Sequence, residues 1–452
     1  MIVAMPLFLQ NLDTSILGTA LNSIAVSLDV QVLHLNLAIT SYLLSLALFL
    51  PAAGWLTDRF GASRLFCTSI AIFSLASVLC GVATSLPQII LFRVLQGLGG
   101  AMMMPVGRLI LLRTTPPSQL ITAMVWYTTP GVIARLFGPL LGGVFVTLMS
   151  WRWIFLINIP FGVLAILLAW KFIPQTESGP GKVEKFDIGG FILMAIGLSG
   201  VVFGLETLGR NFFSLWVTFV IVCVGIASSI AYVLYSRDRS NAIIPLKLFQ
   251  YRAYSAAMLG GLPLRMVIGA SPIFIPLLLQ VGLGFTPIQS GLMCAMLALG
   301  AFGMRPVLQL IVGKFGYRSV LMTAGALTGI TFASYGLFGN QTSIYLMIAA
   351  FLVGGIANSV GMISINTVGF TDIPKGIMSR ATALSTMVQQ TSFSFGVALS
   401  ASCLTLTAHF HGHNADQLNL GDFHLTFFIV GGLALLSVVG LRRLPADEGR
   451  VA

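Results

Sequence analysis

Charge is scarce in this sequence. Asp, Glu, Lys and Arg together make up 8% of its 452 residues, whereas about a quarter of the residues of a typical soluble protein are charged. Hydrophobic residues make up 57%. So few charges cannot cover the surface of a water-soluble chain of this length, and we therefore expect the outer surface to face lipid.

Cysteine pairs and catalytic motifs are also missing. Each of the five cysteines stands alone in an apolar run, which favours small core residues over a disulfide framework: Cys67, Cys80, Cys223, Cys294 and Cys403. No HExxH, GxSxG or phosphate-binding P-loop occurs, so we expect neither an enzyme nor an ATP-driven pump, and no cofactor. No repeated pore loop of the kind found in channels is present.

Apolar runs long enough to cross a membrane fill most of the chain. A spanning helix needs about 20 mainly apolar residues. The runs between charged or Pro/Gly/Asn-rich breaks predict an all-α, polytopic membrane protein with fourteen spans: 2–24, 37–57, 66–84, 87–111, 120–148, 153–172, 188–207, 213–235, 254–280, 287–311, 319–338, 343–366, 380–406 and 424–441.

The excess of basic residues, a formal net charge of +11, indicates orientation. Of the 24 lysines and arginines, 18 lie on one side of the predicted spans and only Arg152 and Arg210 lie on the other. Cytoplasmic loops are rich in Lys and Arg, so we expect both termini in the cytoplasm. No basic stripe occurs, so nucleic-acid binding is not expected. Met1 is followed by an apolar run without a basic flank, and we expect the natural start to lie upstream.

The longest segments on the basic side, 173–187 and 236–253, divide the chain into three parts. We expect an N-terminal six-helix bundle at 1–172 and a C-terminal six-helix bundle at 254–452. Two extra transmembrane helices with flanking cytoplasmic loops are expected between them, at 173–253.

The most distinctive motif lies between the second and third spans. It resembles the G-x-L-x-D-R-x-G-x-R loop of the major facilitator superfamily and consists of Gly54, Asp58, Arg59, Gly61 and Arg64. The glycines predict a tight turn and close helix approach. Asp58 is expected to face a helix N-terminus or pair with an arginine, as part of a cytoplasmic gate. The alternative, an ordinary basic loop, does not explain Asp58 and both glycines.

Residues 313–318 repeat part of this loop 255 residues later. Phe315 and Gly316 align with Phe60 and Gly61, and Gly313 stands in place of the acid. Related six-helix halves are expected of transporter folds of this kind.

The fourth span carries a charge. Arg93 is followed by Gln96, Gly97 and Gly100, which is similar to the R-x-x-Q-G-x-G pattern of the same superfamily. A mid-membrane arginine is costly, so we expect Arg93 to have a partner or water. The alternative is an arginine near the outer interface that reaches the headgroups.

Asp13 lies near the middle of the first span. Residues 12–16 and 20–22 resemble the L-D-x-T-I…A-L-P signature of the fourteen-span drug:proton antiporters, with Asn22 where proline is usual. Burial favours the neutral form of such a carboxyl group and a nearby arginine favours the charged form, a balance that suits proton exchange. We expect Asp13 to act in proton coupling with Arg93 as its electrostatic partner. A purely structural Asp is the alternative.

The fifth span is similar to the antiporter motif of the superfamily, with Gly131, Gly138, Pro139, Gly142 and Gly143. Its glycines recur at helical spacing, which predicts a smooth face for close packing and a role in outer-side gating, and a proline inside a helix predicts a kink. Arg135 lies on the same face, where the family usually has a small residue or proline. This departure favours either a polar cavity beside Arg135 or different local packing.

Residues 151–160 are also very close to a signature of the fourteen-span branch, of EmrB and QacA type. The resemblance covers essentially the whole chain. It implies the major facilitator fold, with two six-helix bundles around a central cavity. It also implies proton-driven drug efflux by alternating access across the bacterial inner membrane. Small-molecule substrates, protons and the lipid bilayer are the expected partners, and no periplasmic adaptor is identified.

The substrate is less clearly indicated. Intramembrane polar residues form a candidate cavity set: Gln96, Arg265, Asn358 and Gln389. Helix–helix hydrogen bonding is the alternative for these residues. The predicted spans contain four arginines but only two acids, Asp13 and Glu206. Because of this positive surplus, export of organic anions or metal chelates stays open. Uptake by a proton-coupled symporter also stays open, because a fold does not determine the direction of transport.

The outer segment after the thirteenth span contains His409, His411 and His413, followed by Asp416. Alternate histidines can bind a transition metal. No second ligand cluster occurs in another loop, so we expect a solvated polar loop and no metal site.

Overall fold

The computed structural model describes residues 2–116, 119–173, 186–207, 214–237, 239, 242–244, 246–374, 377–412, 418–442 and 444. Regular structure in these ranges is helical, without a strand. By length and apolar composition, 11 of the described helices can span a membrane, or up to 12 if one bent pair forms a single span. The all-α membrane architecture is confirmed, whereas the count of fourteen stays a prediction.

The chain divides into two compact units. Unit 1 comprises Met1–Ser199 and Val224–Ile244, and unit 2 comprises Gly200–Cys223 and Pro245–Ala452. The division falls within the two helices that the sequence predicts as additions to the bundles, α9 (Ile188–Thr207) and α10 (Leu215–Ser236), and each contributes residues to both units. The predicted three-part division of the chain stays a prediction.

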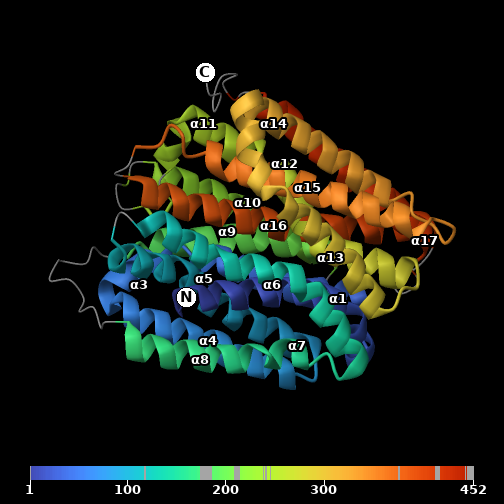
Figure 1. Cartoon of the computed structure of the whole chain (residues 1–452), viewed down its shortest axis with the longest axis horizontal. Coiled ribbons are helices and arrows are strands. Elements are labelled where there is room, and N and C mark those ends of the chain that lie inside the picture. The colour runs from blue at the N-terminus through green and yellow to red at the C-terminus, as the bar shows by residue number, and fades with distance from the viewer. Residues whose placement is uncertain are drawn as a thin grey trace. The chain divides into compact units, whose positions relative to one another are not determined.

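Unit 1 is built on contacts between long helices. Its remaining helices are α1 (Met5–Leu28), α2 (Asn36–Phe49), α3 (Ala52–Phe60), α4 (Ala62–Val82), α5 (Leu86–Thr114), α6 (Leu120–Leu148), α7 (Trp153–Leu156) and α8 (Asn158–Phe172), with short 3₁₀ helices at Ile2–Ala4 and Val32–Leu35. Helix α1 packs on α6, and α8 packs on α4 (Figure 1). Helix α5 packs on both α2 and α4.

Unit 2 repeats this plan. It contains a 3₁₀ helix (Leu246–Gln250), α11 (Arg252–Ser255), a π-helix (Ala256–Gly260), α12 (Leu262–Leu277), a second π-helix (Leu278–Gly282), α13 (Pro287–Gly303), α14 (Arg305–Tyr335), α15 (Ile344–Val368), α16 (Met378–Phe410) and α17 (Leu420–Leu441). Helix α12 packs on α16, α13 on α15, and α14 on α15 and α17.

Large apolar side chains cover much of the helix surface. Large apolar residues that are more than half exposed include Leu75, Trp170, Trp216, Phe219, Leu310 and Leu436. In water these exposed groups would be unfavourable, so this surface is suited to lipid. The few charged residues are consistent with that surface.

The predicted repeat is visible in the backbone. Gly61 joins α3 to α4 with φ 83°, and Gly316 interrupts α14 with φ 75°. Only glycine adopts such angles readily, so the same turn is built at both positions. Pro51 precedes α3 and Pro306 lies in the first turn of α14, again 255 residues apart.

Three predicted ranges differ in detail from the helices. The range 37–57 is divided at Pro51 into α2 and α3, and the range 254–280 is divided by π-helical turns. The predicted break at 312–318 contains a kink at Gly316, the non-helical residue at which two helical segments of α14 meet. One glycine with positive φ redirects the chain there without a loop.

Candidate functional site

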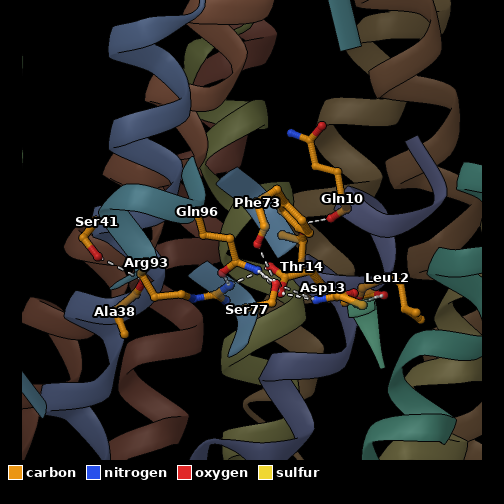
Figure 2. Close-up of polar contacts among 12 residues, drawn as sticks. Gln10, Leu12, Asp13, Thr14, Ala38, Ser41, Phe73, Ser77, Arg93 and Gln96 are labelled. Carbon is orange, nitrogen blue, oxygen red and sulfur yellow. Dashed lines mark hydrogen bonds and ion pairs between the residues drawn. The ribbon is translucent and has the colours of Figure 1, made fainter. Parts of the chain in front are cut away.

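A buried ion pair lies inside unit 1. Asp13 of α1 and Arg93 of α5 are each 1% exposed, and Arg93 Nη1 lies 2.6 Å from Asp13 Oδ2 (Figure 2). The alternative that Arg93 reaches an outer interface does not fit this burial. Taking two charges out of water is unfavourable unless further hydrogen bonds stabilise them, so the neighbouring groups decide the character of the site.

Three neutral polar side chains complete the network. Gln96 accepts a hydrogen bond from Arg93 at 2.6 Å and donates to Asp13 Oδ1 at 2.9 Å and to Ser77 at 2.8 Å. Asn158 of α8 donates to Asp13 Oδ1 and to Ser77, each at 3.3 Å. Helices α1, α4, α5 and α8 therefore meet at the Asp13 carboxylate, which accepts hydrogen bonds from three different side chains.

Two aromatic rings cover the guanidinium group of Arg93. Its Cζ lies 4.8 Å from the ring centroid of Tyr42 and 5.3 Å from that of Phe155. Ring faces attract cations, and this attraction strengthens when water is excluded. The rings thus stabilise the arginine while they close the site to solvent in this conformation.

Glycines on α5 bring Arg93 into place. A Cβ atom on Gly97 would lie 2.6 Å from Ser45 Cβ of α2, and one on Gly99 would lie 2.7 Å from the backbone nitrogen of Phe73 in α4. Ser45 also donates to the carbonyl oxygen of Val94 at 2.7 Å. Because these glycines lack side chains, α5 can lie directly against two helices.

The fifth-span glycines face α1. A Cβ on Gly142 would meet the Ile16 carbonyl oxygen at 2.6 Å, and one on Gly138 would clash with Ser15. Gly131 faces Asn11 in the same way. Pro139 and Gly143 are buried within α6. Smooth packing therefore occurs along this helix pair, although the gating role stays a prediction.

Arg135 departs from this packing. Its side chain is exposed and its Nε donates to Asn11 Oδ1 of α1 at 2.5 Å. The position lies about halfway along the 29 residues of α6. An exposed arginine at that depth would be costly in lipid, so the environment beside α1 and α6 is expected to be polar.

The expected cytoplasmic gate loop is exposed. Asp58, Arg59 and Arg64 are all exposed, and the structure gives Asp58 no ion pair among its described residues. Gly61 forms the expected tight turn. At Gly54, an added Cβ would meet no described atom within 4 Å, and the close helix approach expected there stays a prediction.

The candidate cavity residues fall into separate places. Gln96 belongs to the network around Asp13 in unit 1. In unit 2, Arg265 contacts Asn366, which in turn contacts Gln389. Asn358 instead accepts a hydrogen bond from Thr328 of α14 at 3.3 Å, which fits the alternative of helix–helix bonding.

The histidines after the predicted thirteenth span are only partly described. His411 Nδ1 lies 2.6 Å from Asp422 Oδ1 of α17, whereas His413 and Asp416 lie outside the described residues. Within the described ranges, no group of three or more His, Cys, Asp or Glu residues is arranged to hold a metal ion.

Sequence reasoning missed Ser77 and Asn158 as members of the site. Both are polar residues in apolar runs and both are fully buried. That pattern is a usable signal, because buried polar side chains in membrane helices need partners. It does not identify the partners, which come from helices distant in sequence.

Comparisons with known proteins show the family of the chain. The sequence matches the Major Facilitator Superfamily over residues 4–397, with a further match over 257–451. It is 37% identical over 449 residues to multidrug resistance protein MdtD of Salmonella heidelberg (strain SL476), covering 99% of this chain and 94% of that protein. MdtD of Salmonella typhimurium (strain LT2) shows the same identity and coverage.

Solved transporter structures share the fold. A D-xylose–proton symporter gives a TM-score of 0.69 at 14% identity, covering 100% of this chain and 98% of that one. A POT family transporter in complex with 5-aminolevulinic acid gives 0.71 at 14% identity, covering 97% and 94%. At such identities the similarity concerns the fold alone.

Proposed function

The chain belongs to the Major Facilitator Superfamily, and from this we propose that it is a proton-driven exporter of small molecules in which Asp13 carries the proton. The buried contact of Asp13 with Arg93, Gln96 and Asn158 is the observation that supports this role. Relatives named as multidrug resistance proteins support drug-like molecules as substrates.

The finer placement is part of the proposal. The motifs at residues 12–22 and 151–160 support the fourteen-span drug:proton antiporter branch, with a six, two and six division of helices. The distribution of Lys and Arg supports a bacterial inner membrane protein with both termini in the cytoplasm. Transport, rather than an enzymatic reaction, is the function of the whole chain in this proposal.

The network has two forms that differ by one proton. With Asp13 ionised, its oxygens accept the hydrogen bonds from Arg93, Gln96 and Asn158, and its charge balances that of Arg93. With Asp13 protonated, the ion pair is lost and one oxygen becomes a donor. The guanidinium group then lacks its counter-charge, and the contacts among α1, α5 and α8 must rearrange.

This difference links protons to substrate. A substrate that binds more tightly to the ionised form causes release of the proton on the cytoplasmic side, because a ligand shifts an equilibrium by its differential affinity. Reprotonation of Asp13 from the outside then favours release of the substrate there. The cycle moves protons inward and substrate outward by alternating access.

Inverted membrane vesicles test this proposal. The vesicles are energised, and the pH gradient is followed with a fluorescent dye while a panel of lipophilic cations and organic anions is added. Asp13→Asn is compared with Asp29→Asn, a matched control on the same helix. Asp29 is exposed at the C-terminus of α1 with φ 52°, a conformation that Asn also tolerates.

We expect substrate-dependent collapse of the pH gradient with the natural protein and with Asp29→Asn, but not with Asp13→Asn. Equal collapse with both variants would show that Asp13 does not carry the proton. Collapse only when substrate moves in the same direction as protons would instead establish a symporter.

A further inference from the structure

A second buried arginine lies in unit 2. Arg265 of α12 has no exposed surface, and it is among the largest fully buried side chains of the described chain. It lies 13 residues after the start of α11 at Arg252, or about 20 Å along a helix at 1.5 Å per residue. The segment that is long and apolar enough to span a membrane is Leu262–Gly282, so Arg265 lies in its first turn.

Arg265 differs from Arg93 because it lacks a counter-charge. Its Nη2 donates to Asn366 Oδ1 at 3.0 Å and its Nη1 lies 3.5 Å from the sulfur of Met258. Its Nε is buried and has no hydrogen-bond partner among the described residues. An arginine keeps its proton in proteins, so a full positive charge remains incompletely satisfied.

The acids described in unit 2 do not balance this charge. Asp372 accepts the backbone N–H of Ala253 at 2.8 Å, and Asp422 pairs with His411. No ion pair joins Arg265 to these residues or to Glu206 within the described part of the chain. Such a charge is expensive in a membrane protein and usually serves a function.

The local backbone also suits a binding site. A π-helix, Ala256–Gly260, directly precedes α12, and π-helical turns are frequent at functional sites. Gly261 allows α15 to approach, since a Cβ there would clash with Ile365, the neighbour of Asn366. Asn366 Nδ2 continues the contact to Gln389 Oε1 of α16 at 3.4 Å.

We propose that Arg265, Asn366 and Gln389 form a binding site for the carboxylate group of an organic anion that the protein transports. The guanidinium fork matches a planar carboxylate, and the two amides can donate further hydrogen bonds. A single arginine with neutral neighbours suits a single negative charge better than the doubly charged phosphate group. Asn366 and Gln389 are only partly buried, so they connect Arg265 to the accessible surface of unit 2.

This inference rests on the proposed transport function but can fail independently. Its main rival is a structural arginine that bonds α12 to α15. The two explanations differ in their consequences for stability. An arginine that is kept for binding costs stability without its ligand, so an apolar replacement should stabilise the empty protein. Replacement of a structural arginine should instead lower the stability of the empty protein.

Thermal unfolding of the purified protein in detergent separates the explanations. The midpoint of thermal unfolding is measured without ligand, with benzoate, succinate or a tricarboxylate, and with uncharged benzamide. Arg265→Met removes the charge at similar length, and Arg265→Lys keeps the charge without the fork. Arg152→Met is the control, because Arg152 stacks on Trp151 at 4.4 Å in unit 1.

We expect at least one carboxylate, but not benzamide, to raise the midpoint of the natural protein and of Arg152→Met. Arg265→Met should lose this shift while its own midpoint equals or exceeds that of the natural protein, and Arg265→Lys should show a reduced shift. The proposal is overturned if no carboxylate raises the natural midpoint, if Arg265→Met keeps the full shift, or if Arg265→Met is destabilised without ligand.

The vesicle experiment keeps the two proposals distinct. If cations are exported in exchange for protons and no carboxylate binds, the proposed anion site is wrong but the proposed exporter function is supported. If carboxylates bind in a way that requires Arg265 but no protons move during transport, the anion site is supported and the proton-driven mechanism is wrong.

Discussion

The pairing of Asp13 with Arg93 makes a quantitative prediction about stability. Both side chains are 1% exposed and 2.6 Å apart. Removing one partner of a buried pair leaves an uncompensated charge and typically costs about 3–5 kcal/mol. We therefore expect Asp13→Asn and Arg93→Met each to destabilise unit 1 by an amount in that range.

The double variant should be much less destabilised than the sum of its parts. With Asp13→Asn and Arg93→Met together, no buried charge remains, and contacting pairs commonly show coupling energies of up to about 3 kcal/mol. The thermal midpoint should be highest for the natural protein, lower for the double variant and lowest for the two single variants.

A thiol-reactive fluorescent dye provides the assay. Cys80 is fully buried and lies one helical turn from Ser77, so it reacts when this part of unit 1 opens. Cys223 is exposed and Cys67 and Cys403 are partly exposed, so these three are first replaced by serine to remove background. If the double variant is as unstable as the summed single variants, the pair is not energetically coupled and the reasoning fails.

Three further predictions concern glycines and a helix start, each measured as a thermal midpoint in the same assay. Gly61→Ala forces a side chain into φ 83° and should lower the stability by about 1–3 kcal/mol. Gly54→Ala should leave the stability unchanged, because no atom lies within 4 Å of an added Cβ. Equal effects of the two substitutions would contradict the turn at Gly61. Gly142→Val should push α1 away from α6 and lower the stability by about 1–3 kcal/mol. Gly432→Val should not do so, because no atom lies within 4 Å of an added Cβ there. An unchanged midpoint for Gly142→Val would argue against the packing of α1 on α6. Asp187→Ala removes the acceptor for the first turn of α9 and should cost about 1 kcal/mol; an unchanged midpoint would show that this bond is not needed.

The sequence was sufficient for the all-α membrane architecture and for the central contact. Long apolar runs predict membrane helices because an isolated backbone in lipid must satisfy its hydrogen bonds internally. Asp13 and Arg93 stood out because charges in apolar runs need partners, and they proved to be neighbours. The repeated Phe-Gly pair correctly indicated two equivalent turns, since positive φ selects glycine strongly.

Other features depended on tertiary contacts and were not predictable. Ser77 and Asn158 enter the site only because α4 and α8 pack beside α5 and α1. Asn358 bonds to α14 instead of joining Arg265, because helix spacing alone does not show which face meets which neighbour.

Proton release on substrate binding tests the central claim most directly. Purified protein in weakly buffered detergent is mixed with a substrate identified in vesicles, and a pH indicator records released protons while binding is measured separately. The account predicts proton release by the natural protein and by Asp29→Asn, and binding without release by Asp13→Asn. Equal release by Asp13→Asn would contradict the assignment of Asp13 as the proton carrier.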